Sequence, residues 1–371
     1  MIGRRRPTAA DLENATGRGP ALCRASWTGR PLFTRGRVVG LLAAGLALLP
    51  GMARAGSLGD VFERVAPSVV VVRTTDRDIP ETGERRSVSV SGLGSGVLMS
   101  SDGTVLTAAH LVQTASEIRV DLVGGARVAA RVIASEPDAD VAVLQLERVP
   151  AGAVVARLGD SDRARIGDEV FVVGAPYGIS HTLTVGHVGG RHQPGQVWDR
   201  FTLAEFLQTD AAINQGNSGG PMFNMAGEVI GVVSHIISKS GGFEGLGFVV
   251  TSNVARQLLL NRRSPWWGFD GVLLTEDLAR VFNLAGPGLL VQRVVENSPA
   301  ARLGLRGGFM KARVGDRTLT VGGDVILGVQ GMPCNETHRV QDALAVLKPG
   351  DRVTVTVLRE GKVLDLAMVL P

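Results

Sequence analysis

Residues 216–221 read Gly-Asn-Ser-Gly-Gly-Pro, and this stretch decides how the rest of the chain is interpreted. Glycines around a single serine let the backbone turn tightly enough to expose the hydroxyl, while nearby N–H groups converge on one point. Such a loop builds a nucleophile and an anion-binding pocket together. Because a serine hydroxyl is a poor nucleophile until a base takes its proton, Ser218 also requires a histidine and an acid that orients it.

The chain offers both partners upstream of the serine. His110 ends the apolar segment 105–109, where a rigid element can project the imidazole into a cleft. Asp140 comes directly before the apolar run 141–146, where its carboxylate can hold the neutral imidazole tautomer and stabilise the imidazolium. Each residue alone says little, but the order His110, Asp140, Ser218 is the order of the triad in chymotrypsin. We therefore predict a serine protease.

A second enzyme class shares part of this pattern. Residues 216–220 also satisfy Gly-x-Ser-x-Gly, the nucleophile turn of α/β-hydrolase esterases. That fold needs a helix after the serine and the chain order Ser, acid, His. Residues 222–231 instead predict strand, turn and strand, and only His235 and His338 follow the serine, neither in a matching context. The esterase is the less favoured alternative.

The sequence predicts no metal centre and no cofactor. Residues 92–96 (Gly-Leu-Gly-Ser-Gly) resemble a phosphate loop but lead into a strand without a further spaced glycine, so they predict a bent strand. Glu136, Asp138 and Asp140 lie close together in sequence, but no histidine or third ligand is spaced to join them in a metal site.

Composition and charge narrow the class of partner. The chain has 371 residues, 44% of them hydrophobic and 4% aromatic, which indicates about two soluble globular domains. Its net charge is +4, but residues 1–55 hold nine arginines against Asp11 and Glu13, a local charge of +7. The remaining 316 residues therefore carry about −3, which argues against nucleic acid as a partner. Cys23 and Cys334 form neither a zinc-binding nor a disulfide pattern.

Residues 38–49 form an uninterrupted apolar stretch near the N-terminus. Arg35 and Arg37 precede it and Ala53-Arg54-Ala55 follows, which gives the basic region, short hydrophobic region and small-residue cleavage site of a secretory signal peptide. The stretch is too short to cross a bilayer core of about 30 Å as a helix. We predict that residues 1–55 are a signal peptide, cleaved after Ala55, and that the protein is periplasmic or otherwise exported. The alternative is a leader kept as an anchor.

Residues 56–261 have the pattern of an all-β domain. Short segments rich in valine, isoleucine and leucine alternate with turn residues at intervals of about ten, which is typical of a β-barrel or sandwich. A helix is expected at 252–260, and Arg-Arg-Ser-Pro at 262–265 indicates a linker. The expected strands include residues 68–73, 96–100, 118–122, 141–146 and 170–173.

Residues 262–371 predict a second, small α+β domain. Its strand candidates are 288–294, 324–329 and 353–358, and its helix candidates are 275–282, 299–303 and 337–347. No period of 20 to 50 residues repeats along the chain, which excludes a solenoid.

Three stretches of the first domain resemble the HtrA/Deg family of serine proteases: residues 107–112, 138–146 and 207–221. The last of them, which contains Gln-Gly-Asn-Ser-Gly-Gly-Pro, is highly specific, and Gly-Ala-Pro-Tyr-Gly at 174–178 fits as well. The resemblance covers about residues 57–371. It implies a mostly β fold, in which a chymotrypsin-like double β-barrel is followed by one PDZ domain, and a homotrimer that degrades misfolded or mislocalised envelope proteins.

The same resemblance implies a role for each site residue. His110 corresponds to the base, Asp140 to its orienting acid and Ser218 to the nucleophile. The backbone N–H groups of Gly216 and Ser218, with that of Asn217 between them, correspond to the oxyanion hole.

In the second domain, Trp267-Gly268-Phe269 falls where the family has its carboxylate-binding loop, whose backbone amides bind a peptide C-terminus. Residues 297–305 match the turn and helix of a PDZ domain, and 323–326 match the strand that follows. Such a domain adds its ligand as a strand to an open sheet edge. Because tryptophan and phenylalanine are larger than the residues usual in this loop, their side chains could instead belong to the core.

Two segments depart from the family pattern and are where we expect regulation peculiar to this protein. Residues 306–322 are longer than a minimal PDZ connection and are expected to be a loop, and residues 190–205 lie just before the serine loop. Residues 233–236 and 245–248 are expected to line the primary specificity pocket. Because no acid is evident there, small or medium apolar side chains are the expected preference before the cut.

The sequence thus predicts an exported serine endopeptidase that degrades unfolded or mislocalised envelope proteins through an acyl-enzyme, while its PDZ domain binds C-terminal peptides. The alternative from a different class is a latent protease that acts mainly as a chaperone or peptide-binding scaffold. Both keep the same fold and the same triad, so the sequence does not separate them.

Overall fold

The computed structural model describes residues 57–78, 88–179, 181–198, 201–261, 265–315, 317–334, 347 and 350–370. The predicted signal peptide at 1–55 lies outside these ranges, as does the helix expected at 337–347 except for its last residue. Within the described ranges, no helix is long and apolar enough to cross a membrane.

A short helix that the sequence patterns did not predict precedes the first strand. Helix α1 (Leu58–Val65) begins with a reciprocal cap, in which Ser57 Oγ accepts from the Asp60 N–H and the Asp60 carboxylate accepts from the Ser57 N–H. The 3₁₀ turn η1 (Ala66–Ser68) then leads into β1. Val61 and Val65 face the core, so packing fixes an element of only two turns.

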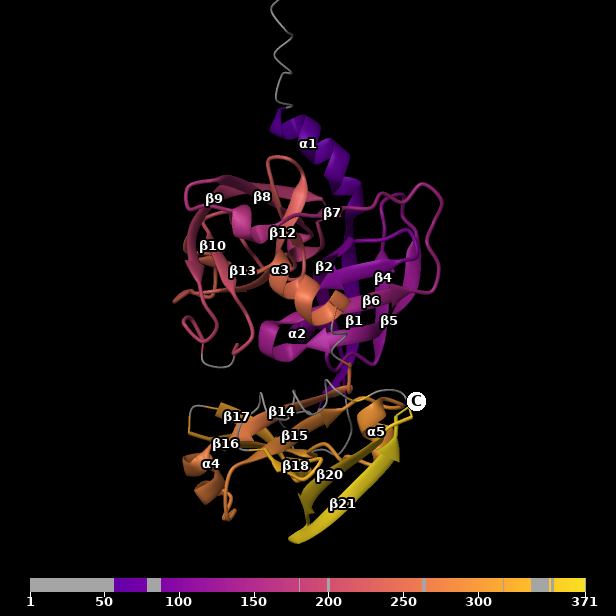
Figure 1. The fold of residues 1–371 in the computed structure, drawn as a ribbon, viewed down its shortest axis with the longest axis vertical. Coiled ribbons are helices and arrows are strands. Elements are labelled where there is room, and N and C mark those ends of the chain that lie inside the picture. Colours follow the sequence, from indigo (N-terminus) through magenta and orange to yellow (C-terminus); the bar gives the residue numbers. More distant parts are fainter. Residues whose placement is uncertain are drawn as a thin grey trace, which may run out of the picture. The chain divides into compact units, whose positions relative to one another are not determined.

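The first barrel, drawn in indigo to magenta in Figure 1, is a closed antiparallel sheet in the order β1-β2-β3-β6-β5-β4. All four residues of the valine run that opens β1 are buried, because Val70 and Val72 fill the barrel while Val69 faces the core shared with the second barrel. The strands are β1 (Val69–Asp78), β2 (Val88–Leu98), β3 (Thr104–Thr107), β4 (Glu117–Asp121), β5 (Arg127–Glu136) and β6 (Val141–Leu146); α2 (Ala109–Val112) follows β3, and the 3₁₀ turn η2 (Pro137–Ala139) precedes β6.

The second barrel follows the order β11-β8-β9-β10-β13-β12 and closes where β11 pairs with β12. Strand β7 (Arg157–Leu158) adds to β12 in parallel. The other strands are β8 (Glu169–Gly174), β9 (Thr182–His192), β10 (Phe206–Thr209), β11 (Pro221–Asn224), β12 (Glu228–Ile236) and β13 (Gly247–Thr251), with 3₁₀ turns η3 (Ser161–Arg163) and η4 (Pro176–Gly178). The serine is therefore followed by a strand, turn and strand, which contradicts the esterase alternative.

One buried cluster joins the two barrels. It combines Val97 and Val141 of the first barrel with Phe171 and Phe223 of the second, whose rings stack with centroids 5.2 Å apart. The cluster therefore packs the two barrels directly against each other.

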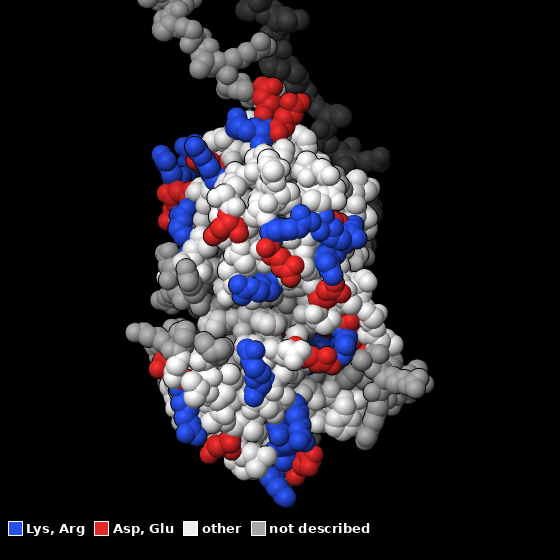
Figure 2. All heavy atoms as spheres, turned by 90° about the vertical axis from the view of Figure 1, so that its right-hand side faces the viewer, with Lys and Arg blue, Asp and Glu red and all other residues white. Residues whose placement is uncertain are grey.

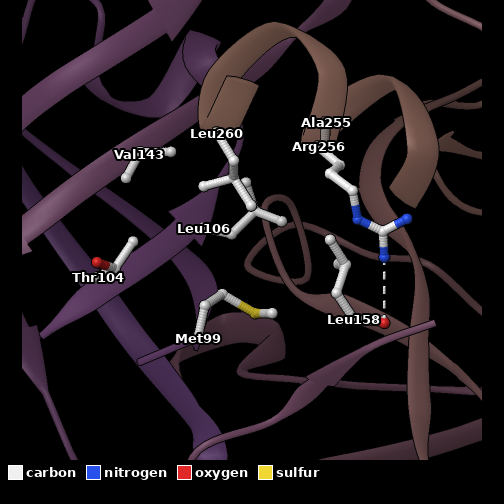
Figure 3. A pocket seen from close by; sticks show the side chains of 8 residues that line it. All are labelled: Met99, Thr104, Leu106, Val143, Leu158, Ala255, Arg256 and Leu260. Atoms are coloured by element: carbon white, nitrogen blue, oxygen red, sulfur yellow. Dashed lines mark hydrogen bonds between the residues drawn. The ribbon is translucent and has the colours of Figure 1, made fainter. Parts of the chain in front are cut away.

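The helix expected at 252–260 is present, but only its first turn is α-helical. It consists of α3 (Ser252–Ala255) followed by a π-helical segment, η5 (Arg256–Asn261). Figure 3 shows a small apolar pocket beneath this segment, where Arg256 donates to the Leu158 carbonyl at 3.2 Å. Leu258 and Leu259 belong to the shared core, so the segment completes the double barrel.

The C-terminal part is the predicted α+β module. Its sheet follows the order β14-β15-β18-β20-β21, with β19 paired to β18, so β14 and β21 are the edge strands. The elements are β14 (Phe269–Leu274), α4 (Glu276–Val281), β15 (Gly288–Val294), α5 (Pro299–Leu303), β16 (Met310–Val314), β17 (Arg317–Val321), β18 (Val325–Val329), β19 (Met332–Pro333), β20 (Arg352–Arg359) and β21 (Lys362–Val369). The predicted boundary at 261/262 falls between η5 and β14.

The sequence predicts a loop at residues 306–322, but the structure has two strands within this range. Strands β16 and β17 form a separate hairpin. Leu319 is buried with Leu274 and Ala279, so the hairpin covers the side of the module where α4 lies. Charged side chains of both signs are interspersed over the face shown in Figure 2, which therefore has no extended basic field.

Candidate active site

His110 is held directly against Asp140. The imidazole lies on α2 immediately after β3, and its Nδ1 is 2.9 Å from Asp140 Oδ1 and 3.0 Å from Oδ2. The backbone N–H of His110 also donates to Asp140 Oδ1 at 3.0 Å. Because a carboxylate accepts, Nδ1 carries the hydrogen, which leaves Nε2 as the basic nitrogen.

Asp140 occupies a strained and buried position at the start of β6. Its φ of 53° lies in the left-handed region, and only 2% of the residue is exposed. Burial raises the pKa of the carboxyl, but the charge and hydrogen bond of His110, together with His235 and Ser234, outweigh burial, so the pKa of Asp140 lies below its usual range. Asp140 is therefore the ionised partner that a triad needs.

The loop that carries Ser218 is pressed against the residues that lead to His110. Ser95 N–H donates to the Ser218 carbonyl at 2.8 Å, and Gly219 N–H donates to the Val233 carbonyl at 2.7 Å. A Cβ on Gly219 would lie only 2.3 Å from Thr107 Oγ1, and the φ of this glycine is +79°. Only glycine fits this close approach, which explains why a glycine follows Ser218.

No hydrogen bond between Ser218 Oγ and the His110 ring occurs among the described residues. In substrate-free enzymes this contact is often long and shortens only when substrate binds. The structure therefore brings His110 and Asp140 into contact and places the Ser218 loop beside them.

The three amides predicted for the oxyanion hole differ in what they bind. The Asn217 N–H donates to the Asn214 carbonyl at 3.0 Å, inside the same loop. Among the backbone hydrogen bonds between described residues outside helices and strands, none starts from the N–H of Gly216 or of Ser218. In this conformation the Asn217 amide is used internally, while Gly216 and Ser218 remain the candidate donors.

The sequence predicts that Ser234 and His235 line the specificity pocket. In the structure both residues also contact Asp140. Ser234 Oγ donates to Asp140 Oδ2 at 2.5 Å and lies 2.6 Å from His235 Nδ1, which is itself 3.4 Å from the same Oδ2. The rings of His235 and His110 have centroids 5.2 Å apart. Asp140 thus lies beside two imidazoles, an arrangement that no local motif in the sequence announces.

Two aromatic residues of segment 190–205, which departs from the family pattern, pack against His235. Trp198 and Phe201 contact the His235 ring, with centroids 5.6 and 5.0 Å away. Trp198 also packs edge-on against Phe206 and Phe248 of the second barrel. Trp198 and Phe201, from the segment that departs from the family pattern, therefore lie next to the triad and hold the His235 ring in place.

The predicted peptide-binding loop lies between the linker and β14. The carbonyls of Trp267 and Gly268 accept from the N–H groups of Ala300 and Val295, at 3.0 and 2.8 Å. These bonds tie the loop to the start of α5 and to the end of β15. The loop thus meets an edge strand of the sheet at Phe269, where β14 begins.

The side chains of Trp267 and Phe269 pack against the core of the module, the alternative that the sequence left open. They line an apolar cavity of about 40 Å³ together with the buried Cys334. Burial raises the pKa of the Cys334 thiol to about 11, so this cysteine is unreactive at neutral pH. The buried indole Nε1 of Trp267 has no hydrogen-bond partner within the described part of the chain.

Two protein-family models match the chain. The model of the trypsin-like peptidase domain matches residues 94–232, and that of the PDZ domain matches residues 246–370. The second match begins one residue before β13, a strand that pairs with β10 and β12 and so belongs structurally to the second barrel.

Curated relatives share both parts. A probable periplasmic serine endoprotease DegP-like of Pseudomonas putida (strain GB-1) is 37% identical over 299 residues, which cover 77% of this chain and 58% of the relative. The periplasmic pH-dependent serine endoprotease DegQ of Escherichia coli (strain K12) is 32% identical over 336 residues, which cover 85% of this chain and 70% of the relative. The chain thus spans somewhat more than half the length of the DegP-like relatives.

Solved structures agree with the observed fold. The HtrA-type protease AlgW with decapeptide has 29% identity and a TM-score of 0.50, and the match covers 85% of this chain and 98% of AlgW. The complex of AlgW with tripeptide has 31% identity and a TM-score of 0.50, covering 85% and 96%. A trypsin-like double barrel, a PDZ domain and these relatives together show that the chain belongs to the HtrA/Deg family of serine proteases.

Proposed function

We propose that this protein is an exported serine endopeptidase that cleaves unfolded or mislocalised envelope proteins. The observation that carries the proposal is the hydrogen-bonded pair of His110 and Asp140, with the Ser218 loop packed against the residues that precede His110. The names of the two curated relatives, a probable periplasmic serine endoprotease and a periplasmic pH-dependent serine endoprotease, support the same reaction and compartment.

In the proposed reaction each group has one task. His110 Nε2 takes the proton of Ser218 as its oxygen attacks the scissile carbonyl, and Asp140 stabilises the imidazolium that forms. The N–H groups of Gly216 and Ser218 receive the developing oxyanion. The imidazolium then protonates the leaving amine, and water releases the acyl group by the same path in reverse.

Digestion of unfolded β-casein tests the proposal. Ser218→Ala should lower turnover by about six orders of magnitude, because the nucleophile is lost. Ser89→Ala is the matched control, since this serine lies in an exposed part of β2. Mass spectrometry of the products should show small or medium apolar residues before each cut. Suppressed aggregation of denatured protein without cleavage would instead favour the chaperone alternative.

The second part of the proposal is that the PDZ domain captures peptide C-termini. Among the described residues, strand β14 pairs only with β15, so its other edge is the one we propose for an added strand, and the Trp267-Gly268-Phe269 loop lies at its start. Fluorescence anisotropy with a labelled peptide that ends in apolar residues should report binding. The same peptide with an amidated C-terminus should bind at least about tenfold more weakly, because a charge-assisted contact is lost.

Export and assembly complete the proposal. The composition of residues 1–55 supports a signal peptide, and N-terminal sequencing of protein recovered from the periplasm should begin at Gly56. The family resemblance supports a homotrimer. Sedimentation velocity of the Ser218→Ala variant should therefore give three times the mass of the chain, and a monomer at micromolar concentration would contradict this part.

A further inference from the structure

The fold brings a second histidine to the triad acid from a strand far away in sequence. His235 on β12 lies 3.4 Å from Asp140 Oδ2 through its Nδ1, while His110 Nδ1 lies 3.0 Å from the same oxygen. One possible ligand atom from each of the three residues lies within 4.8 Å of the others.

Two imidazoles and one carboxylate are a ligand set that Zn²⁺ prefers, with a fourth position left for water. Bonds of about 2.0–2.2 Å in a tetrahedral site place ligand atoms about 3.3–3.5 Å apart. The two separations from Asp140 Oδ2, 3.0 and 3.4 Å, are already close to that spacing. We propose that His110, Asp140 and His235 form a binding site for Zn²⁺ that reversibly inhibits the protease.

Neighbouring groups hold the three ligands in place. Ser234 Oγ lies 2.5 Å from Asp140 Oδ2 and 2.6 Å from His235 Nδ1, so it holds these two ligand atoms close together. The rings of Trp198 and Phe201 support His235 from behind. A site whose ligands are fixed before binding loses little conformational entropy when the ion arrives.

Two of the three ligands are partly exposed to solvent. The side chain of His110 is 37% exposed and that of His235 is 25% exposed, whereas Asp140 forms the buried floor. Binding at Nδ1 moves the hydrogen of the neutral His110 imidazole to Nε2, so Nε2 can no longer accept the proton of Ser218. The inhibitory consequence rests on the proposed function, but binding itself does not.

Binding is measured first on the Ser218→Ala variant, without a histidine tag, so that autolysis and activity play no part. Isothermal titration with ZnCl₂ should give one ion per chain. Titration with CoCl₂ should give the intense visible absorption of tetrahedral Co²⁺, a signature that a six-coordinate surface site lacks. MgCl₂ should not bind, because this ion avoids imidazole ligands.

Two substitutions at the site and one elsewhere separate this cluster from other histidines. His235→Phe and His235→Gln should each weaken Zn²⁺ binding by at least about 100-fold, since loss of an outer-shell group alone costs 10- to 100-fold. His187→Phe should leave binding unchanged, because His187 forms an exposed pair with Asp210, 3.9 Å away, and no described residue adds a third ligand there. Thermal unfolding of each variant confirms that it is folded.

Inhibition is then measured with a fluorogenic peptide, each variant being normalised to its own rate without metal. Zn²⁺ should inhibit the wild type and the His187→Phe variant equally, EDTA should restore activity, and both His235 variants should resist. Equal binding or equal inhibition with and without His235 would overturn the proposal, as would no binding at 1 mM ZnCl₂. Binding in a protein without protease activity would refute the proposed function and leave the metal site standing.

Discussion

Ser234 donates its hydroxyl hydrogen to Oδ2 of Asp140, 94 residues away in sequence, at 2.5 Å. The bond crosses from the second barrel to the first and holds Oδ2 of the buried carboxylate, the oxygen that also lies 3.0 Å from His110 Nδ1. Ser234→Ala should lower kcat/KM roughly tenfold, because a hydrogen bond to a charged group is worth about 1.5–3 kcal/mol and only part of it is felt in the transition state. Steady-state kinetics with a fluorogenic peptide measures the change.

The conservative variant Ser234→Thr keeps the hydroxyl and should recover most of the activity. If Ser234 only filled space, alanine and threonine would affect the rate in proportion to their volumes, and rescue by threonine would not occur.

Acid should destabilise the protein partly through Asp140. Because the pKa of this carboxyl is lower in the folded than in the unfolded chain, its contribution to stability is fully present above about pH 5 and is lost as the pH falls through the folded pKa. Asp140→Asn, in the Ser218→Ala background, should therefore lose less unfolding free energy between about pH 5 and pH 3 than its parent. Urea titrations at each pH give the two slopes, and identical slopes would show that Asp140 does not titrate abnormally.

Gly219→Ala adds only one methyl group, but it should lower the rate of cleavage strongly. The new methyl group would meet Ser95 O at 2.4 Å and Ala108 N at 2.8 Å, so the serine loop must shift away from His110. A displacement of about 1 Å costs about 100-fold in rate. Gly124→Ala is the control: its φ of +87° imposes the same backbone strain, but open space surrounds it. If the two variants lost cleavage rate to a similar extent, backbone strain alone would account for the effect of Gly219→Ala.

The PDZ domain depends on a buried ion pair. Arg359 donates from Nε and Nη2 to the two carboxylate oxygens of Asp324, both at 2.7 Å, and the Asp324 side chain is 1% exposed. Arg359→Met should lower the unfolding free energy of this domain by about 3–5 kcal/mol, because Asp324 would be left charged and buried. Arg280→Met, which breaks an exposed pair on α4, should cost less than about 1 kcal/mol. Chemical denaturation followed by circular dichroism compares the two.

The parts of the molecule that local sequence defines were predicted well. The segments that became β6, β15 and α5 were predicted with their observed bounds, because hydrophobic runs between turn residues or capping residues mark both ends. The family resemblance, the two-barrel fold and the PDZ domain are confirmed. The signal peptide and the helix expected at 337–347 fall on residues outside the described ranges.

The features that escaped prediction depend on contacts between distant segments. Nothing near Ser234 or His235 in the sequence points to Asp140, because only closure of the second barrel against the first brings them together. The hairpin formed by β16 and β17 has a weak alternating pattern, and its stability comes from burying Leu319 against α4. Similarly, the Asn217 amide is used within its own loop, which a motif cannot reveal.

The central claim is that Ser218 is a nucleophile activated by His110 and Asp140, and covalent trapping tests it most directly. The purified protein is treated with a fluorophosphonate, with and without a peptide that ends in apolar residues, and modified peptides are identified by mass spectrometry. We predict phosphonylation at Ser218, none at Ser89, and a loss of at least about 1,000-fold in the rate for His110→Ala. An unmodified Ser218 under both conditions, or an equal rate in the His110→Ala variant, would contradict the account.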